Sequence, residues 1–84
     1  MNTTEIIEIL RGIIKPFIKN QDAFENLTET TDFITDLQIN SANLVDIILD
    51  IEDAFKIEID NLSMEKMLNI KAALNIIETK LAEK

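Results

Sequence analysis

Apolar residues recur at helical spacing in three stretches of this chain, and this periodicity is the strongest constraint on its fold. The clearest case is residues 41–55, where four apolar side chains share one narrow stripe when each residue turns the chain by about 100°. A helix with one buried face has this geometry. We therefore expect a helix over residues 41–55 whose core face is formed by Leu44, Ile48, Ile51 and Phe55.

Two further long helices are expected at the ends of the chain. Asn2 followed by Glu5 fits a capping box, which predicts a first helix over about residues 3–15. Pro16 favours a bend near its end, towards Lys19, because the proline ring crowds the carbonyl four residues earlier. Asn69 is a good N-cap for a last helix over residues 70–82. The inward positions are Ile6, Ile9, Leu10, Ile13 and Phe17 in the first helix and Ile70, Ala73, Leu74, Ile77 and Leu81 in the last.

The remaining segments complete a four-helix arrangement. Residues 20–40 are polar with scattered apolar side chains, and a connection of this length is expected to be ordered by packing those side chains on the core. A turn over Lys56–Asp60 leads to a short helix near Asn61–Met67. We predict an all-α fold in one domain spanning residues 1–84: a four-helix bundle with three longer helices, one short third helix and a long first loop.

The composition excludes several kinds of active site. Without cysteine or histidine, the chain has no thiolate nucleophile, Ser-His-Asp triad or common zinc site. A single glycine excludes the Gly-rich loops that cradle nucleotide phosphates. Catalysis would rest on carboxylates, lysines or hydroxyls alone, so we do not expect an enzyme or a metal site.

The charge of the chain narrows the choice of partners. Sixteen acidic residues against eight basic ones give a net charge of −8, which disfavours nucleic acid and anionic membranes. No apolar run approaches the roughly 20 residues of a membrane span, and residues 1–5 do not resemble a signal-peptide start. We expect a soluble, cytoplasmic protein. Its acidic excess is greatest in residues 41–60, which hold six acids and one base.

The segment from Asp36 to Asp46, with the sequence DLQINSANLVD, resembles the attachment site of acyl carrier proteins. In that family an Asp-Leu pair precedes a serine at the start of an acidic helix, and residues 47–59 continue the similarity. The resemblance, to a stand-alone carrier, implies that Ser41 bears a 4′-phosphopantetheine arm derived from coenzyme A. The thiol of the arm would hold acyl intermediates as thioesters for fatty-acid, polyketide or related specialised biosynthesis.

The surroundings of Ser41 suit this role physically. A helix start favours a negative group such as a phosphodiester. Acidic side chains on the same helix would steer the protein onto basic patches of partner enzymes, and Val45 and Leu49 would add apolar contacts on the side of Ser41. The expected partners are a phosphopantetheinyl transferase and acyl-transferring, condensing or ligase enzymes. We expect the carrier itself to be a monomer. Partner contacts are expected at Asn40, Ala42, Val45, Asp46, Leu49, Asp50, Glu52 and Asp53, and the resemblance implies an acyl-chain pocket that involves Leu49, Ile57, Ile59 and Met67.

Three residues depart from the family pattern. The usual Asp-Ser-Leu is Asn40–Ser41–Ala42 here, and Asn43 replaces an acid that often follows the serine by two positions. Asn40 keeps the shape of aspartate without its charge, and Ala42 shortens an apolar contact. These differences bear on which transferase accepts the chain, and they indicate a dedicated carrier of a specialised pathway.

Other interpretations remain open at this point. A serine before an apolar helix is most often only an N-cap, an acidic face is often only solvated surface, and Val45 and Leu49 would also suit a wider core stripe. The main alternative function is a non-carrier acidic helical module that binds a basic protein surface. Calcium binding is poorly supported because the acids follow helical spacing and lack the glycine of a calcium loop. An enzyme built on carboxylate pairs has no supporting constellation.

Overall fold

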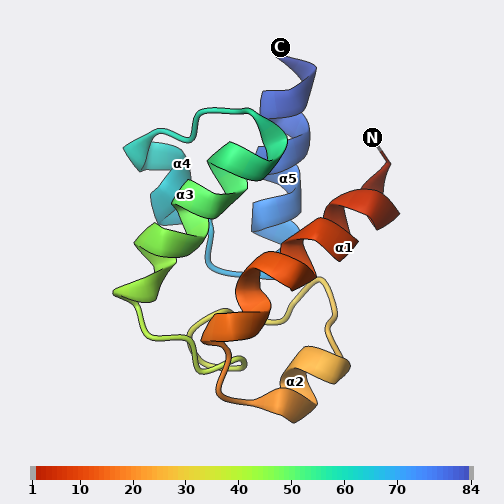
Figure 1. Cartoon of the computed structure of the whole chain (residues 1–84), viewed down its shortest axis with the longest axis vertical. Coiled ribbons are helices and arrows are strands. Elements are labelled where there is room, and N and C mark those ends of the chain that lie inside the picture. The colour runs from red at the N-terminus through yellow and green to blue at the C-terminus, as the bar shows by residue number, and fades with distance from the viewer. Residues whose placement is uncertain (1, 84) are drawn as a thin grey trace.

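A computed structural model of the protein describes residues 2–83, which form helices and connecting loops without a β-strand (Figure 1). Met1, part of the N-terminal segment considered above, and Lys84 lie outside the described residues. The elements are α1 (Thr3–Ile14), the 3-10 helix η1 (Lys15–Phe17), α2 (Gln21–Glu25), α3 (Asn43–Phe55), α4 (Asn61–Lys66) and α5 (Ile70–Ala82). None of these helices is long and apolar enough to cross a membrane.

Most of the α-helices begin at a side chain that accepts a hydrogen bond from the first turn. Asn2 accepts from the backbone N–H of Glu5 at 2.8 Å, and Asn69 accepts from that of Ala72 at 2.8 Å, as the sequence predicts for both caps. Asn20 and Asp60 cap α2 and α4 in the same way. Such caps satisfy N–H groups that have no partner inside the helix. Only α3, among the described α-helices, lacks a side-chain cap.

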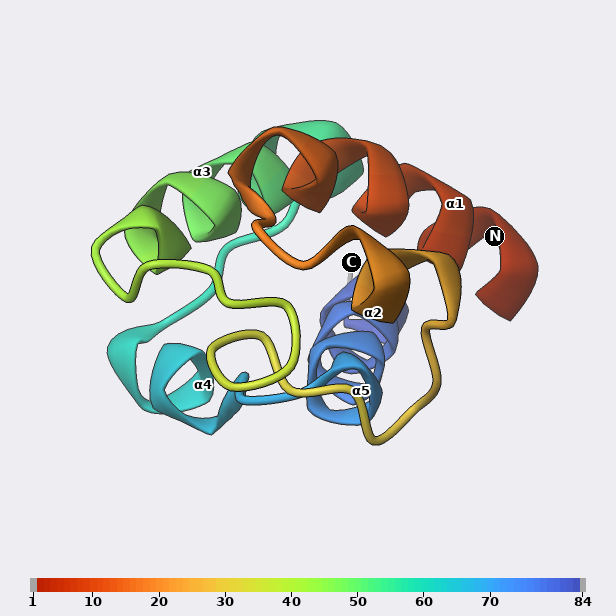
Figure 2. The ribbon, with the colours of Figure 1, turned by 90° about the horizontal axis from the view of Figure 1, so that it is seen from below.

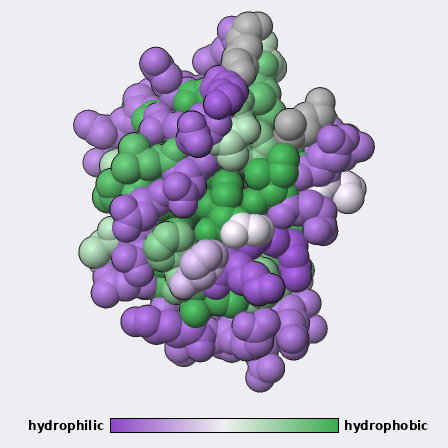
Figure 3. Space-filling view, viewed as in Figure 1, coloured by the Kyte–Doolittle hydropathy of each residue, from purple (hydrophilic) through white to green (hydrophobic). Residues whose placement is uncertain are grey.

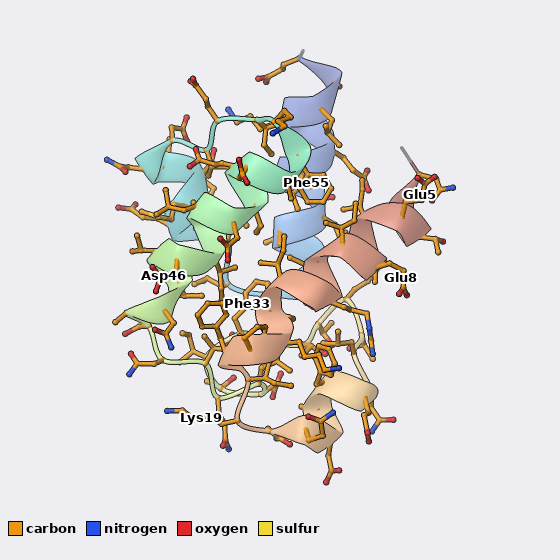
Figure 4. The ribbon with its side chains drawn as sticks, in the orientation of Figure 1. Glu5, Glu8, Lys19, Phe33, Asp46 and Phe55 are labelled. Atoms are coloured by element: carbon orange, nitrogen blue, oxygen red, sulfur yellow. The ribbon has the colours of Figure 1, made fainter. Side chains whose placement is uncertain are left out.

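The helices form two layers around one core (Figure 2). One layer contains α1 and α3 and the other contains α4 and α5, with α1 also packing against α5. Phe33 and Phe55 point into the interior between them, whereas Glu5 and Glu8 lie at the periphery (Figure 4). The all-α prediction with three longer helices and a short helix before the last one is confirmed.

The long connection after α1 is ordered, as expected. Its side chains Phe24, Phe33, Leu37 and Ile39 are buried in the core. Its backbone is tied to the start of α5, where the N–H of Ile70 donates to the carbonyl of Thr31 at 3.0 Å. The connection also contains α2, which was not predicted from the sequence because a helix of five residues is too short to show a helical period.

Helix boundaries and the core face of α3 differ slightly from expectation. α1 ends at Ile14 and passes into η1, which contains Pro16, so the bend falls where the sequence predicts it. α3 begins at Asn43 rather than at Ser41. The fully buried stripe of α3 contains Ile47, which was not expected, while Leu44 is only half-buried. The stripe is wider than predicted because Ile47 lies against a small cavity that Phe33, Met64 and Met67 also line.

Candidate functional site

Ser41 lies in a turn immediately before α3, and the turn is held by its neighbours. The side-chain oxygen of Asn40 accepts from the N–H of Ala42 at 2.9 Å, and the backbone carbonyl of Asn40 accepts from the N–H of Asn43 at 2.9 Å. The carbonyl of Ser41 accepts from the N–H of Leu44 at 3.1 Å. Within residues 2–83 the Ser41 hydroxyl makes no hydrogen bond, and the residue is exposed.

This geometry decides against Ser41 as a plain helix cap. The N-cap position of α3 is Ala42, which has helical backbone angles and offers no side-chain oxygen. Asn40 supplies the side-chain acceptor for the turn instead. The interpretation of Ser41 as only an N-cap is therefore wrong, and no partner within residues 2–83 engages its hydroxyl.

The segment that precedes Ser41 is rigidly anchored. Ile39 is buried, and its N–H donates to the carbonyl of Phe33 at 3.0 Å. Asp36 accepts from the N–H of Asp32 at 2.7 Å. Gln38 adopts the left-handed conformation, with φ of 58°, which turns the chain between these anchors. The position of Ser41, two residues after buried Ile39, is thereby fixed relative to the core.

The outer side of α3 presents apolar and acidic side chains together. Val45 and Leu49 are 51% and 56% exposed, so the interpretation of these two residues as core is wrong. Asp46 and Asp50 are exposed, and neither forms an ion pair within the described part of the chain. Asp53 lies 3.9 Å from Lys56, an exposed pair that contributes little. Figure 4 shows Asp46 on the first turns of α3, and Figure 3 shows apolar surface patches bordered by hydrophilic ones on this face.

Glu52 differs from the neighbouring acids. It was expected on an exposed side of the helix, but it is half-buried. Its Oε2 atom accepts a hydrogen bond from the backbone N–H of Ile59 at 2.7 Å. Because burial and this bond occupy part of the carboxylate, Glu52 orders the loop between α3 and α4 and is less available to partners than Asp50 or Asp53.

The expected acyl-chain pocket is not one cavity. Leu49, Ile57 and Ile59 line an open depression of about 730 Å³ whose other lining residues are mainly charged. Met67 instead belongs to a small enclosed apolar cavity of about 30 Å³ between α3 and α4. That cavity is lined by Phe33, Leu44, Ile47, Ile48, Met64 and Met67. Leu49 faces outward and Met67 faces the interior, so the four residues predicted for the pocket are divided between these two hollows.

One carboxyl group near this surface has a clearly shifted pKa. Hydrogen bonds from the Ser63 side chain and backbone N–H lower the pKa of Asp60, with smaller contributions from Lys80 and Lys66. Asp60 therefore favours its charged form at the start of α4. No cluster of three or more acidic side chains in residues 2–83 is arranged to hold a metal ion.

Comparison with known proteins gives a consistent result. The chain is 29% identical to an acyl carrier protein of Coprothermobacter proteolyticus over the full length of both. It is 32% identical to one of Guillardia theta over 98% of this chain and 99% of the relative. It is 35% identical to one of Cylindrotheca sp. (strain N1) over 71% of this chain and 75% of the relative. No protein-family model matches the chain.

The described residues form a small all-α bundle with an exposed serine ahead of an acidic helix. Relatives named acyl carrier protein, which are carriers and not enzymes, match nearly the whole chain. The chain belongs to the acyl carrier protein family.

Proposed function

We propose that Ser41 bears 4′-phosphopantetheine and that the thiol of this arm holds acyl groups as thioesters. The observation that carries the proposal is the exposed Ser41 hydroxyl, which makes no hydrogen bond within the described residues and lies at a fixed point before α3. The chain has no cysteine, so the arm supplies the thiol that thioester chemistry requires.

The charge distribution near Ser41 is compatible with a phosphodiester. The first turn of α3 carries partial positive charge from its backbone N–H groups, an effect of about 0.3–1 kcal/mol for a nearby anion. Asp46 is the acidic residue in that first turn and opposes this effect in part. Because Ser41 lies two residues before the helix, a phosphate there remains close to the N–H groups and open to solvent.

The exposed face of α3 supports docking to partner enzymes. Val45 and Leu49 offer apolar contact, and Asp46, Asp50 and Asp53 surround them with negative charge. Such a surface favours fast, salt-sensitive encounters with basic patches. We propose a phosphopantetheinyl transferase and acyl-transferring, condensing or ligase enzymes as its partners, with Asn40 and Ala42 at the edge of the contact and a minor role for Glu52.

In this proposal, an acyl chain enters between α3 and α4. The enclosed cavity there has a volume of about 30 Å³, which suits roughly one water molecule. A longer chain therefore requires Met64 and Met67 to change rotamers, and methionine side chains do so readily. Ile57 and Ile59 lie beside this route in the loop that Glu52 holds.

The biological setting follows from the same resemblance. We propose a monomeric cytoplasmic carrier that serves fatty-acid, polyketide or related specialised biosynthesis. The departures at Asn40, Ala42 and Asn43 support a dedicated transferase or pathway. The apolar side chains of the described chain are largely accounted for by one core, which supports the monomer.

The direct test is the intact mass after incubation with coenzyme A, magnesium and a broad-specificity phosphopantetheinyl transferase. Wild type is expected to gain one phosphopantetheine, and Ser41→Ala none. Ser63→Ala, at a half-buried serine in α4, is the matched control and should be modified like wild type. If several transferases, including any from the same organism, leave wild type unmodified, or if Ser41→Ala is modified equally, the proposal fails.

Variants also separate the carrier from a simple acidic binding module. In a carrier, Ser41→Ala alone abolishes acyl transfer. In a non-carrier module, Ser41→Ala retains full function, while replacement of Asp46, Asp50 and Asp53 by lysine destroys binding. The observation that gives this alternative its weight is that Asp46 and Asp50 are exposed and form no ion pair with any other described residue.

A further inference from the structure

A second apolar cavity lies away from the Ser41 surface. It has a volume of about 200 Å³ and is formed by α1, the loop after α2 and the first turns of α5. None of its lining residues belongs to the Ser41 turn, to α3 or to the cavity between α3 and α4. In both ribbon views the loop after α2 and the start of α3 lie on opposite sides of the molecule (Figures 1 and 2).

The cavity has an apolar floor and a polar rim. Leu10, Ile70 and Leu74 are buried residues that line it. Ile7 and Leu27 are half-buried lining residues, and the polar lining residues are Arg11, Thr28 and Glu29. An apolar cavity of this kind is poor for water, which needs several polar partners, but good for a small apolar group.

Arg11 is held at this cavity without an acidic partner. Its guanidinium carbon lies 4.6 Å from the centroid of the Phe24 ring, and its Nη1 donates to the carbonyl of Phe24 at 3.4 Å. Within residues 2–83 it forms no ion pair, although acids outnumber bases by 16 to 8 in the chain. A guanidinium has five N–H donors, so most of them remain available to a ligand.

We propose that this cavity binds a free apolar carboxylate, with its tail among Leu10, Ile70 and Leu74 and its carboxylate paired with Arg11. Arginine matches carboxylate geometry with two parallel hydrogen bonds. Since a dry cavity of about 150 Å³ accommodates benzene, this one suits a tail of roughly six to eight carbon atoms. Glu29 is exposed on the same rim, and its negative charge repels the anion and so weakens binding.

The test is a titration of the Ser41→Ala variant with octanoate, followed by methyl NMR. This background excludes any effect of an attached arm, so the result is independent of the proposed function. Saturable shifts are expected at Ile7, Leu27 and Leu74, with octylamine binding more weakly than octanoate. Arg11→Gln should weaken octanoate binding at least threefold, Glu29→Gln should tighten it, and Lys15→Gln, at an exposed cation in η1, should leave it unchanged.

A blocking variant completes the design. Leu27→Trp at the half-buried wall should fill the cavity and abolish binding, and circular dichroism checks that the variant remains helical. The proposal is overturned if octanoate gives no saturable shift, or if the shifts centre on Ile47 and Met64. It is also overturned if folded Arg11→Gln binds octanoate as tightly as its parent.

Discussion

At the scale of single residues, Asn40 supplies the side-chain hydrogen-bond acceptor for the turn before α3, so Ser41 does not have to supply it. Elsewhere in the bundle, Asn or Asp caps its helix directly. Before α3 the acceptor lies one residue earlier than Ser41, and it bonds to the N–H of Ala42. The serine hydroxyl is therefore not needed to form the turn, which is compatible with the proposed attachment of an arm at Ser41.

Asn40→Asp should increase the rate of phosphopantetheine transfer. A carboxylate keeps the acceptor for the Ala42 N–H and restores the charge usual in the family, which would strengthen contact with a basic transferase. The measurement is the initial rate of modification by mass spectrometry. Asn40→Ala, which loses the acceptor, should be slower than wild type. Equal rates for Asn40→Asp and wild type would show that charge is not limiting.

Lys56→Gly should stabilise the protein. Lys56 follows α3 with φ of 57° in the left-handed region, where a side chain costs about 1 kcal/mol that glycine avoids. We expect the free energy of unfolding to rise by roughly 0.5–1 kcal/mol. Part of the gain is lost because glycine also adds freedom to the unfolded chain. Urea unfolding measures the change in this free energy. Lys56→Ala keeps a Cβ and should show no gain; a gain as large as that of glycine would refute the conformational cause.

At the scale of elements, the short helix α4 depends on its N-cap residue and on the loop before it. Asp60 accepts from the N–H of Ser63 at 2.7 Å, and Glu52 holds the N–H of Ile59. A helix of six residues has little stability of its own, so these two carboxylates and the packing of Met64 and Met67 keep it in place. The mobility of α4 should therefore respond to their charge.

Acidification should weaken the contribution of Asp60. Its pKa is lowered from the usual 3.8 in the folded state. The stabilisation is therefore fully present above that value and is lost as pH falls through the lower folded pKa. Asp60→Asn keeps a cap without titrating. The free energy of unfolding of each protein is measured by urea unfolding. Between pH 7 and pH 3, wild type should lose stability relative to Asp60→Asn. A difference that is constant with pH would contradict the role of this carboxylate.

At the scale of the whole molecule, the acidic excess opposes the compact state. The net charge is −8, and the described residues contain two ion pairs, Lys56 with Asp53 and Lys80 with Glu83. The first pair is exposed and the second is partly buried on the Lys80 side, and two pairs near the surface compensate little of the repulsion. The surface that suits docking to basic partners is thus also a source of instability in the free protein.

Added salt should raise the melting temperature. Screening reduces repulsion between the exposed acids, and the effect should appear between low ionic strength and physiological salt in a thermal melt followed by circular dichroism. The double variant Asp46→Asn with Asp50→Asn should melt higher at low salt and depend less on salt. A melting temperature of wild type that is the same at low and high salt would contradict this account.

The sequence by itself determined the long helices, the caps of the first and last of them, and the acidic surface. Helical periods over residues 4–18, 41–55 and 70–82 are local patterns, and the caps at Asn2 and Asn69 depend on residues three positions apart. These features need no knowledge of distant contacts.

Only the tertiary structure decided which side chains share a cavity and which polar side chains form hydrogen bonds with distant parts of the chain. Glu52 became half-buried because the loop folds back to place Ile59 beside it, and Met67 separated from Leu49 because α4 packs against the inner side of α3. The cavity beside Arg11 joins α1, residues 27–29 and α5, which are far apart in the chain. Such groupings depend on how the elements pack together, and packing across distant segments leaves no local periodicity to read.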